Sequence, residues 1–138
     1  MIDLNFLNNK KILITGHTGF KGRWLVGLLS QLCNAKLFCV APRDIFFNES
    51  RVFFENINIE ESLIDITNAK KVDNLIRKIS PDVIIHLGAQ SFVNEAISNP
   101  LKTFSTNILG TANVLAAAGA LEKKILLLNI TSDKVYKN

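Results

Sequence analysis

Three glycines spaced three residues apart form the segment of this chain best suited to bind a ligand. They lie in the run Gly16-His17-Thr18-Gly19-Phe20-Lys21-Gly22, which follows the apolar stretch 12–15 and begins an amphipathic segment. This order predicts a strand, a glycine turn and the start of a helix. The glycines allow a tight turn, a close approach of the backbone to phosphate and close helix–strand contact, while free amides at a helix N-terminus bind anions. The run is therefore suited to hold a pyrophosphate.

The other predicted strand ends decide whether this turn belongs to a site, because a glycine turn between a strand and a helix can be purely structural. Ligands of open parallel sheets bind beyond the carboxyl ends of the strands. Each of these ends is polar or rich in glycine. They are Ala41-Pro42-Arg43-Asp44, Asp65-Ile66, His86-Leu87-Gly88-Ala89-Gln90 and Thr131-Ser132-Asp133-Lys134. Their convergence at one edge of the sheet favours a binding site.

Short apolar runs alternate with segments of helical spacing along the chain. This alternation is typical of a parallel sheet covered by helices on both faces. The expected strands are Lys11–Thr15, Lys36–Ala41, Ser62–Asp65, Val83–Leu87 and Ile125–Ile130. The sequence thus predicts an α/β fold, a Rossmann-like doubly wound parallel sheet.

Apolar residues at three- and four-residue steps indicate the helices between these strands. The first follows the glycine run and carries Trp24, Leu25, Leu28, Leu29 and Leu32 on one face. A second begins after Thr67, carries Val72, Leu75, Ile76 and Ile79 at these steps, and ends before Pro81. Pro100 separates a short segment around Val93 and Ile97 from a longer helix. Segment 42–58 is expected to be a packed loop with a helical turn, because its phenylalanines are flanked by charged and amide residues.

Composition limits the protein to one domain and excludes several functions. With 138 residues and 48% hydrophobic content, the chain can bury one core. The basic residues behind its net charge of +4 are scattered, which argues against nucleic acid as a partner. Cys33 and Cys39 lack the spacing of a metal site or redox pair, so no metal is expected. Without an apolar run of membrane-spanning length or a signal peptide, a cytoplasmic protein with no membrane contact is expected.

Four stretches of the sequence together resemble one enzyme family. They are GHTGFKG at 16–22, HLGAQ at 86–90, NPLKTFSTNILGTANVL at 99–115 and NITSDKVY at 129–136. In this combination they resemble the N-terminal, NAD-binding part of the CDP-glucose 4,6-dehydratases, within the extended short-chain dehydrogenase/reductase superfamily. The TSDK string is the sharpest signal, because related sugar-nucleotide dehydratases show Thr-Asp-Glu there.

The resemblance implies a bound NAD that is used and regenerated within each turnover of CDP-glucose to CDP-4-keto-6-deoxyglucose. C4 of the glucose is oxidised, water leaves across C5 and C6, and the hydride returns to C6. The implied cofactor site comprises Gly16, His17, Thr18, Gly19, Phe20, Lys21 and Gly22 near the pyrophosphate, Asp65 and Ile66 near the adenine, Leu87, Gly88, Ala89, Gln90 and Asn107 along the inner ribose, and Thr131 beside the nicotinamide. The implied catalytic residues are Ser132, which bonds the substrate oxygen at C4, and Asp133 and Lys134, which eliminate water.

The chemistry of these residue types fits that assignment, although a simpler interpretation stays open. An acid must protonate the leaving C6 hydroxyl and a base must take the C5 proton, as a protonated Asp133 and a neutral Lys134 can do. By sequence position alone, Ser132 and Asp133 would form a turn or helix cap and Lys134 a solvated charge. His86 is interpreted as a packed histidine without a role in proton transfer, and His17 as a positioning residue.

The end of the second strand bears on the choice of cofactor. Arg43 suits a 2′-phosphate, but the neighbouring Asp44 opposes one, so NAD is expected rather than NADP.

The superfamily's tyrosine base and its lysine partner, four residues apart, are expected downstream of the TSDK string. Tyr136 cannot be that base, because this sequence has no residue four places beyond it. The substrate domain is expected beyond residue 138 as well, so residues 1–138 are predicted to form an incomplete NAD-binding domain that is inactive alone.

Two alternatives to this function stay open. One is a non-catalytic nucleotide-binding or dimerisation module, and the other is part of a different NAD-dependent sugar-nucleotide epimerase or dehydratase. In each case the strand Ile125–Ile130 would be an apolar sheet edge, which favours a homo-oligomer.

Overall fold

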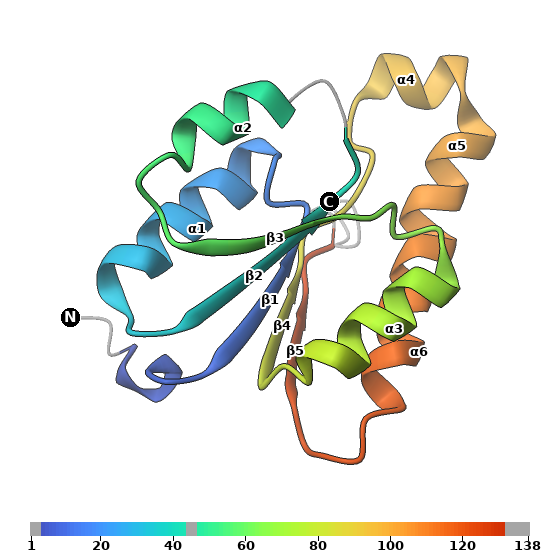
Figure 1. Cartoon of the computed structure of the whole chain (residues 1–138). Helices are drawn as coiled ribbons and strands as arrows, with labels where there is room; N and C mark the ends of the chain where they lie inside the picture. Colours follow the sequence, from blue (N-terminus) through green and yellow to red (C-terminus); the bar gives the residue numbers. More distant parts are fainter. Residues whose placement is uncertain (1–3, 44–46, 132–138) are drawn as a thin grey trace, which may run out of the picture.

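The computed structural model describes residues 4–43 and 47–131. Within these ranges the centre is a parallel sheet in the order β3-β2-β1-β4-β5 (Figure 1). Its strands are β1 (Lys11–Thr15), β2 (Lys36–Ala41), β3 (Ile59–Leu63), β4 (Val83–His86) and β5 (Leu126–Asn129). The predicted α/β class and the doubly wound parallel sheet are confirmed.

Helices cover both faces of the sheet (Figure 1). On one face lie α1 (Phe20–Leu32) and α2 (Phe47–Phe53), and on the other lie α3 (Ala69–Ile79) and α6 (Thr111–Gly119). The connection from β4 to α6 runs through α4 (Val93–Ser98), α5 (Pro100–Phe104) and the π-helical segment η2 (Ser105–Gly110), while a 3-10 turn, η1 (Asn5–Leu7), precedes β1. No described helix has both the length and the apolar character needed to cross a membrane.

Each face of the sheet has its own core. Alternate side chains of β1 point to opposite faces, so Ile12 and Ile14 join one core and Leu13 the other. The first core also contains Val26, Leu29, Cys39 and Phe54, and the second contains Val40, Val72, Ile76, Ile84 and Val114. Because β1 and β4 are covered on both faces, their sequences are continuous apolar runs.

Both cysteines are free thiols in buried positions. Burial is the main cause that raises the pKa of Cys39 to about 12, and the carboxylate of Glu61 adds to it. A thiol held neutral in this way behaves as a small apolar core residue.

The third strand begins three residues earlier than predicted. The apolar pair Leu63 and Ile64 suggests a strand at Ser62–Asp65, whereas β3 spans Ile59–Leu63 and pairs with β2 from Leu37↔Ile59 to Ala41↔Leu63. As an edge strand, β3 tolerates exposed acidic side chains, so its pattern lacks the apolar run of the central strands.

Two helical features also differ from expectation. Segment 42–58 contains a helix, α2, rather than only a helical turn in a packed loop. In α1 the residues facing the sheet are Gly22, Val26 and Leu29, so Trp24 and Leu28, assigned to the same apolar face as Leu29, are more than half exposed. The contact of Gly22 with the preceding turn fixes this rotation of the helix.

Candidate functional site

The carboxyl ends of all five described strands meet at one edge, because the sheet is entirely parallel. β1 is the point where the strand order reverses: β2 and β3 lie to one side of it, and β4 and β5 to the other. In open α/β sheets the ligand crevice forms at this switch point, between the ends of the two diverging strands. Here the glycine turn after β1 faces the loop after β4.

The three glycines of the turn have different surroundings. Gly16 has a φ of +73°, and a Cβ added there would lie 2.8 Å from the Cα of Gly88, so the turn and the β4 loop touch through two glycines. A Cβ on Gly22 would lie only 2.2 Å from the carbonyl oxygen of Gly16. A Cβ on Gly19 would meet nothing among the described residues closer than 3.4 Å. Protein contacts therefore require glycine at 16 and 22, and leave the space at 19 open.

The helix that starts at this turn offers donors to an anion. Gly19 is the N-cap residue of α1 and has no side chain with which to cap it. The first amides of a helix have no intrahelical partner, and the helix dipole adds partial positive charge there. Phe20 and Lys21 in this first turn are exposed, so the N-terminus is open to solvent.

His17 points into the protein instead of out of the turn. Its side chain is fully buried, its Nε2 lies 2.7 Å from Oε1 of Glu61, and its ring packs on Phe54 at 5.7 Å. The adjacent Thr18 is also buried. Sequence reasoning missed Glu61 because the predicted third strand begins one residue after it. The pair joins the glycine turn to β3.

The end of β4 is fixed by a side chain from β1. Oγ1 of Thr15 accepts hydrogen bonds from the backbone amides of Leu87 at 3.2 Å and Gly88 at 2.9 Å. Thr15 is 1% exposed and was not among the predicted site residues. The next residue of the loop, Ala89, is exposed.

Gln90 and Asn107 bind each other. Asn107 accepts the backbone N–H of Gln90 through Oδ1 at 2.7 Å and donates from Nδ2 to the Gln90 carbonyl at 2.9 Å. The Gln90 amide donates to Oγ1 of Thr103 at 3.0 Å and exchanges two further bonds with the backbone of Phe92. Both residues, predicted to contact the cofactor, thus hold the β4–α4 loop against α5 and η2.

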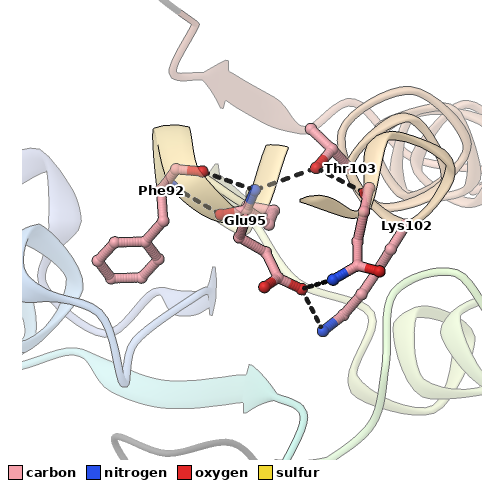
Figure 2. A network of polar contacts seen from close by, with 6 residues as sticks. Phe92, Glu95, Lys102 and Thr103 are labelled. Carbon is pink, nitrogen blue, oxygen red and sulfur yellow. Dashed lines mark hydrogen bonds and ion pairs between the residues drawn. The ribbon is translucent and has the colours of Figure 1, made fainter. Parts of the chain in front are cut away.

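Figure 2 shows how this network continues into α4. Glu95 accepts hydrogen bonds from Lys102 at 3.0 Å and from Asn99 at 3.3 Å, which ties α4 to α5. The ring of Phe92 projects away from these polar contacts and is 55% exposed. The loop after β4 is therefore held at both ends.

Asp65 and Ile66, predicted to lie near the adenine, have different environments. The carboxylate of Asp65 is exposed at the strand-end edge and accepts two bonds from Thr67. Ile66 is 4% exposed, and a Cβ added to Gly110 would lie 2.6 Å from its Cγ1. Asn113 donates to the carbonyl of Ile66 at 2.9 Å. Only Asp65 presents its side chain to solvent.

Thr131, predicted to lie beside the nicotinamide, is exposed just beyond β5 at the same edge of the sheet. The predicted catalytic residues Ser132, Asp133 and Lys134, together with Asp44 and Tyr136, lie outside the described residues. No group of three His, Cys, Asp or Glu side chains suited to a metal occurs in the described ranges.

A doubly wound parallel sheet with a glycine turn at its switch point defines a nucleotide-binding domain of the Rossmann type. The chain belongs to the GDP-mannose 4,6-dehydratase family, whose family model matches residues 13–137.

Individual relatives agree with this assignment. CDP-glucose 4,6-dehydratase of Salmonella typhimurium is 34% identical over 141 residues, which cover 100% of this chain and 38% of that protein. UDP-glucose 4-epimerase of Mycoplasma genitalium is 31% identical, over 91% of this chain and 37% of that protein. The chain therefore spans less than two fifths of the length of these relatives, and the predicted resemblance to the N-terminal part of the CDP-glucose 4,6-dehydratases is confirmed.

Solved structures show the same fold. The structure of Pen from Bacillus thuringiensis has a TM-score of 0.72 and 27% identity, over 82% of this chain and 34% of that one. The Bordetella bronchiseptica enzyme WbmH, solved in complex with NAD+, has a TM-score of 0.67 and 25% identity, over 80% of this chain and 35% of that one.

Proposed function

We propose that this chain supplies the NAD-binding portion of a sugar-nucleotide 4,6-dehydratase that acts on CDP-glucose. The observation that carries the proposal is the space at Gly19, the glycine of the turn that no described protein atom crowds. This space lies at the N-terminus of α1 and at the switch point of the sheet. A pyrophosphate that approaches there would meet free amides and no Cβ.

In this proposal the described residues hold the cofactor along the strand-end edge. The amides of the first turn of α1 bind the pyrophosphate, Asp65 lies toward the adenine, and Gly88 and Ala89 line the inner ribose. The chemistry that NAD would supply here is hydride transfer, away from C4 of the sugar while a base takes the C4 hydroxyl proton, and back to C6. Gln90 and Asn107 act by holding the β4–α4 loop, because their polar atoms already bind protein groups.

The catalytic roles proposed for the residues after β5 follow from the chemistry of the elimination. Ser132 donates a hydrogen bond to the oxygen at C4. A protonated Asp133 gives its proton to the leaving C6 hydroxyl, and a neutral Lys134 takes the C5 proton, which a C4 ketone makes acidic.

A second candidate function is the cofactor portion of a sugar-nucleotide 4-epimerase, which the 31% identity to the Mycoplasma genitalium epimerase supports. A dehydratase fits the sequence better, because the acid and the base needed to remove water stand together in TSDK. The 34% identity to a CDP-glucose 4,6-dehydratase supports CDP-glucose as the sugar nucleotide.

Isothermal titration of the chain with NAD tests the cofactor site, and Gly19→Ser is the informative variant. A Cβ fits at Gly19, and serine is a good N-cap, so the fold should be kept or slightly stabilised. The added side chain would occupy the phosphate position and bind the first-turn amides itself. We expect at least about tenfold weaker NAD binding, the loss of roughly one charge-assisted hydrogen bond, with a melting temperature unchanged or higher.

Gly119→Ala is the matched control, because a Cβ at Gly119 meets nothing within 4 Å. It should bind NAD like the unmodified chain. Equal NAD affinity in Gly19→Ser and the unmodified chain, or no binding by the unmodified chain, would contradict the proposed site.

We also propose that the protein forms a homo-oligomer. Residues 103–121 carry no charged side chain. Along α5, η2 and α6 they expose Phe104 at 59%, Ile108 at 59% and Leu115 at 43%. The edge strand β5 exposes Leu126 and Leu128. An apolar face without charges suits a second copy of itself, since no charge needs an opposite partner.

A further inference from the structure

A chain of three polar side chains lies at the carboxyl ends of β1 and β4, beneath the proposed cofactor site. Oγ1 of Thr15 is 2.6 Å from Nδ1 of His86, and Nε2 of His86 is 3.0 Å from Oγ1 of Thr111. Thr15 and His86 are register partners on the neighbouring strands and are only 1% and 2% exposed. Thr111 begins α6, so the chain of hydrogen bonds links β1, β4 and the long connection between β4 and β5.

The hydrogen bonds of Thr15 determine where the protons of His86 lie. Oγ1 of Thr15 accepts the amide of Gly88 at 2.9 Å and shares the amide of Leu87 with the backbone carbonyl of Thr15, each at 3.2 Å, so both of its lone pairs face backbone donors. Its own hydroxyl proton is then left for Nδ1 of His86, which must act as the acceptor. His86 is therefore the neutral tautomer with its proton on Nε2, and this N–H donates to Thr111.

We propose that neutral His86 is a positioning residue for the cofactor crevice, acting through Thr15 on the amides of Leu87 and Gly88. The inference rests on the proposed NAD site. Gly88 contacts Gly16 of the glycine turn. A change in the hydrogen bonds of the Thr15 hydroxyl would therefore move the loop after β4 relative to this turn. The part of the proposed cofactor site that lines the inner ribose thus depends on a histidine that itself touches no ligand.

Protonation of His86 would disrupt this arrangement. A charged ring carries a proton on Nδ1, which would then face the Thr15 hydroxyl donor to donor, and Thr15 would have to release a backbone amide to accept it. Among the described residues, the hydroxyls of Thr15 on β1 and Thr111 on α6 contact the His86 ring. The register partner of His86 on β5 is Asn129. None of these three side chains is charged. Burial alone lowers the pKa of His86 from its ordinary 6.5.

The direction of the pH effect follows from this lowered pKa. Below pH 6.5 the unfolded chain takes up a proton on this residue before the folded chain does. Folded-state stability from His86 is therefore complete above 6.5 and declines as the pH falls. NAD affinity should decline at lower pH, where the folded chain itself takes up the proton on His86.

Three measurements test the inference on the whole chain. Long-range proton–nitrogen correlation spectra of labelled protein at pH 7 should show His86 with an acceptor-type Nδ1 and a protonated Nε2. Amide exchange at Gly88 should speed up in Thr15→Val and return to normal in Thr15→Ser. NAD titration should show about tenfold weaker binding for Thr15→Val, the loss of one hydrogen bond, and near-normal binding for Thr15→Ser.

His86→Gln adds a pH profile, because glutamine accepts and donates but cannot be charged. The unmodified chain should lose NAD affinity as the pH falls through the folded-state pKa of His86, which lies below 6.5, and the variant should not. A proton on Nδ1 at pH 7, or unchanged Gly88 exchange in Thr15→Val, would overturn the inference. If no NAD binds at any pH, the proposed function fails, while the tautomer and exchange results still decide the role of His86.

Discussion

A methyl group added at Gly22 would meet the carbonyl oxygen of Gly16 at 2.2 Å, in the contact that seats α1 on the glycine turn. Backbone atoms cannot move aside as a flexible side chain can, so Gly22→Ala must shift the helix. We expect a loss of about 1–3 kcal/mol in the free energy of unfolding, the range for overpacking a close contact, together with weaker NAD binding. Urea unfolding followed by Trp24 fluorescence measures the first effect.

Gly119→Ala again serves as the control, and helix propensity predicts that it is neutral or slightly stabilising. If Gly22→Ala unfolds at the same urea concentration as the unmodified chain, the close packing of α1 on the turn is wrong. The contrast with Gly19→Ser separates the two kinds of glycine, one required by packing and one open to a ligand.

The sequence indicates the glycines of the site better than it indicates their polar neighbours. A glycine in the sequence indicates by itself a tight turn or a close backbone contact, so the turn at 16–22 could be predicted directly. The partners of His17 and His86 could not, because Glu61 and Thr15 lie 44 and 71 positions away along the chain. Only the strand register brings them together. The roles of Ser132, Asp133 and Lys134 stay predictions from resemblance.

Asp82 joins two elements at the opposite edge of the sheet. One carboxylate oxygen accepts the backbone N–H of Lys11 at 2.9 Å, and the other accepts the ammonium of Lys123 at 2.9 Å. Both bonds hold the pKa of Asp82 below its ordinary 3.8, and the bond from the Lys11 amide contributes more than the bond from Lys123. Because the folded-state pKa is the lower one, Asp82 stabilises the fold above pH 3.8, and this contribution is lost as the pH falls through the folded-state value.

Asp82→Asn should therefore lower the urea midpoint at neutral pH, and the difference from the unmodified chain should shrink as the pH falls below about 3.8. Asp73→Asn is the control, because Asp73 forms an exposed ion pair with Arg77 within one helix, a contact worth little. Equal midpoints for the two variants at neutral pH would show that Asp82 does not anchor the start of β1.

Burial on both faces separates the elements that could be predicted from those that could not. β1 and β2 match their predicted bounds to the residue, because their continuous apolar runs have a single interpretation. β3 was placed too late because, as an edge strand, it owes its position to the backbone ladder with β2. The rotation of α1 also escaped prediction, since it depends on the contact of Gly22 with a carbonyl.

For the whole molecule, the homo-oligomer proposal makes a prediction about one surface. Ile108→Lys places a charge in the middle of the neutral stretch 103–121 and should give a monomer where the unmodified chain self-associates. Sedimentation velocity at tens of micromolar measures this. Val52→Lys is the control, because Val52 is 75% exposed on α2, which covers the other face of the sheet. A monomeric unmodified chain, or equal association of both variants, would contradict the proposal.

The position of β1 at the centre of the sheet has a consequence for biosynthesis. Its partner β2 follows soon after it on the chain, but its other neighbour is β4, and Thr15 pairs with a residue 71 positions later. At ribosomal rates of about 5–20 residues per second, β1 waits roughly 4–14 seconds with one apolar edge unpaired. During that interval the nascent chain exposes an edge of a strand that the finished fold covers on both faces, and it is then a natural target for chaperones.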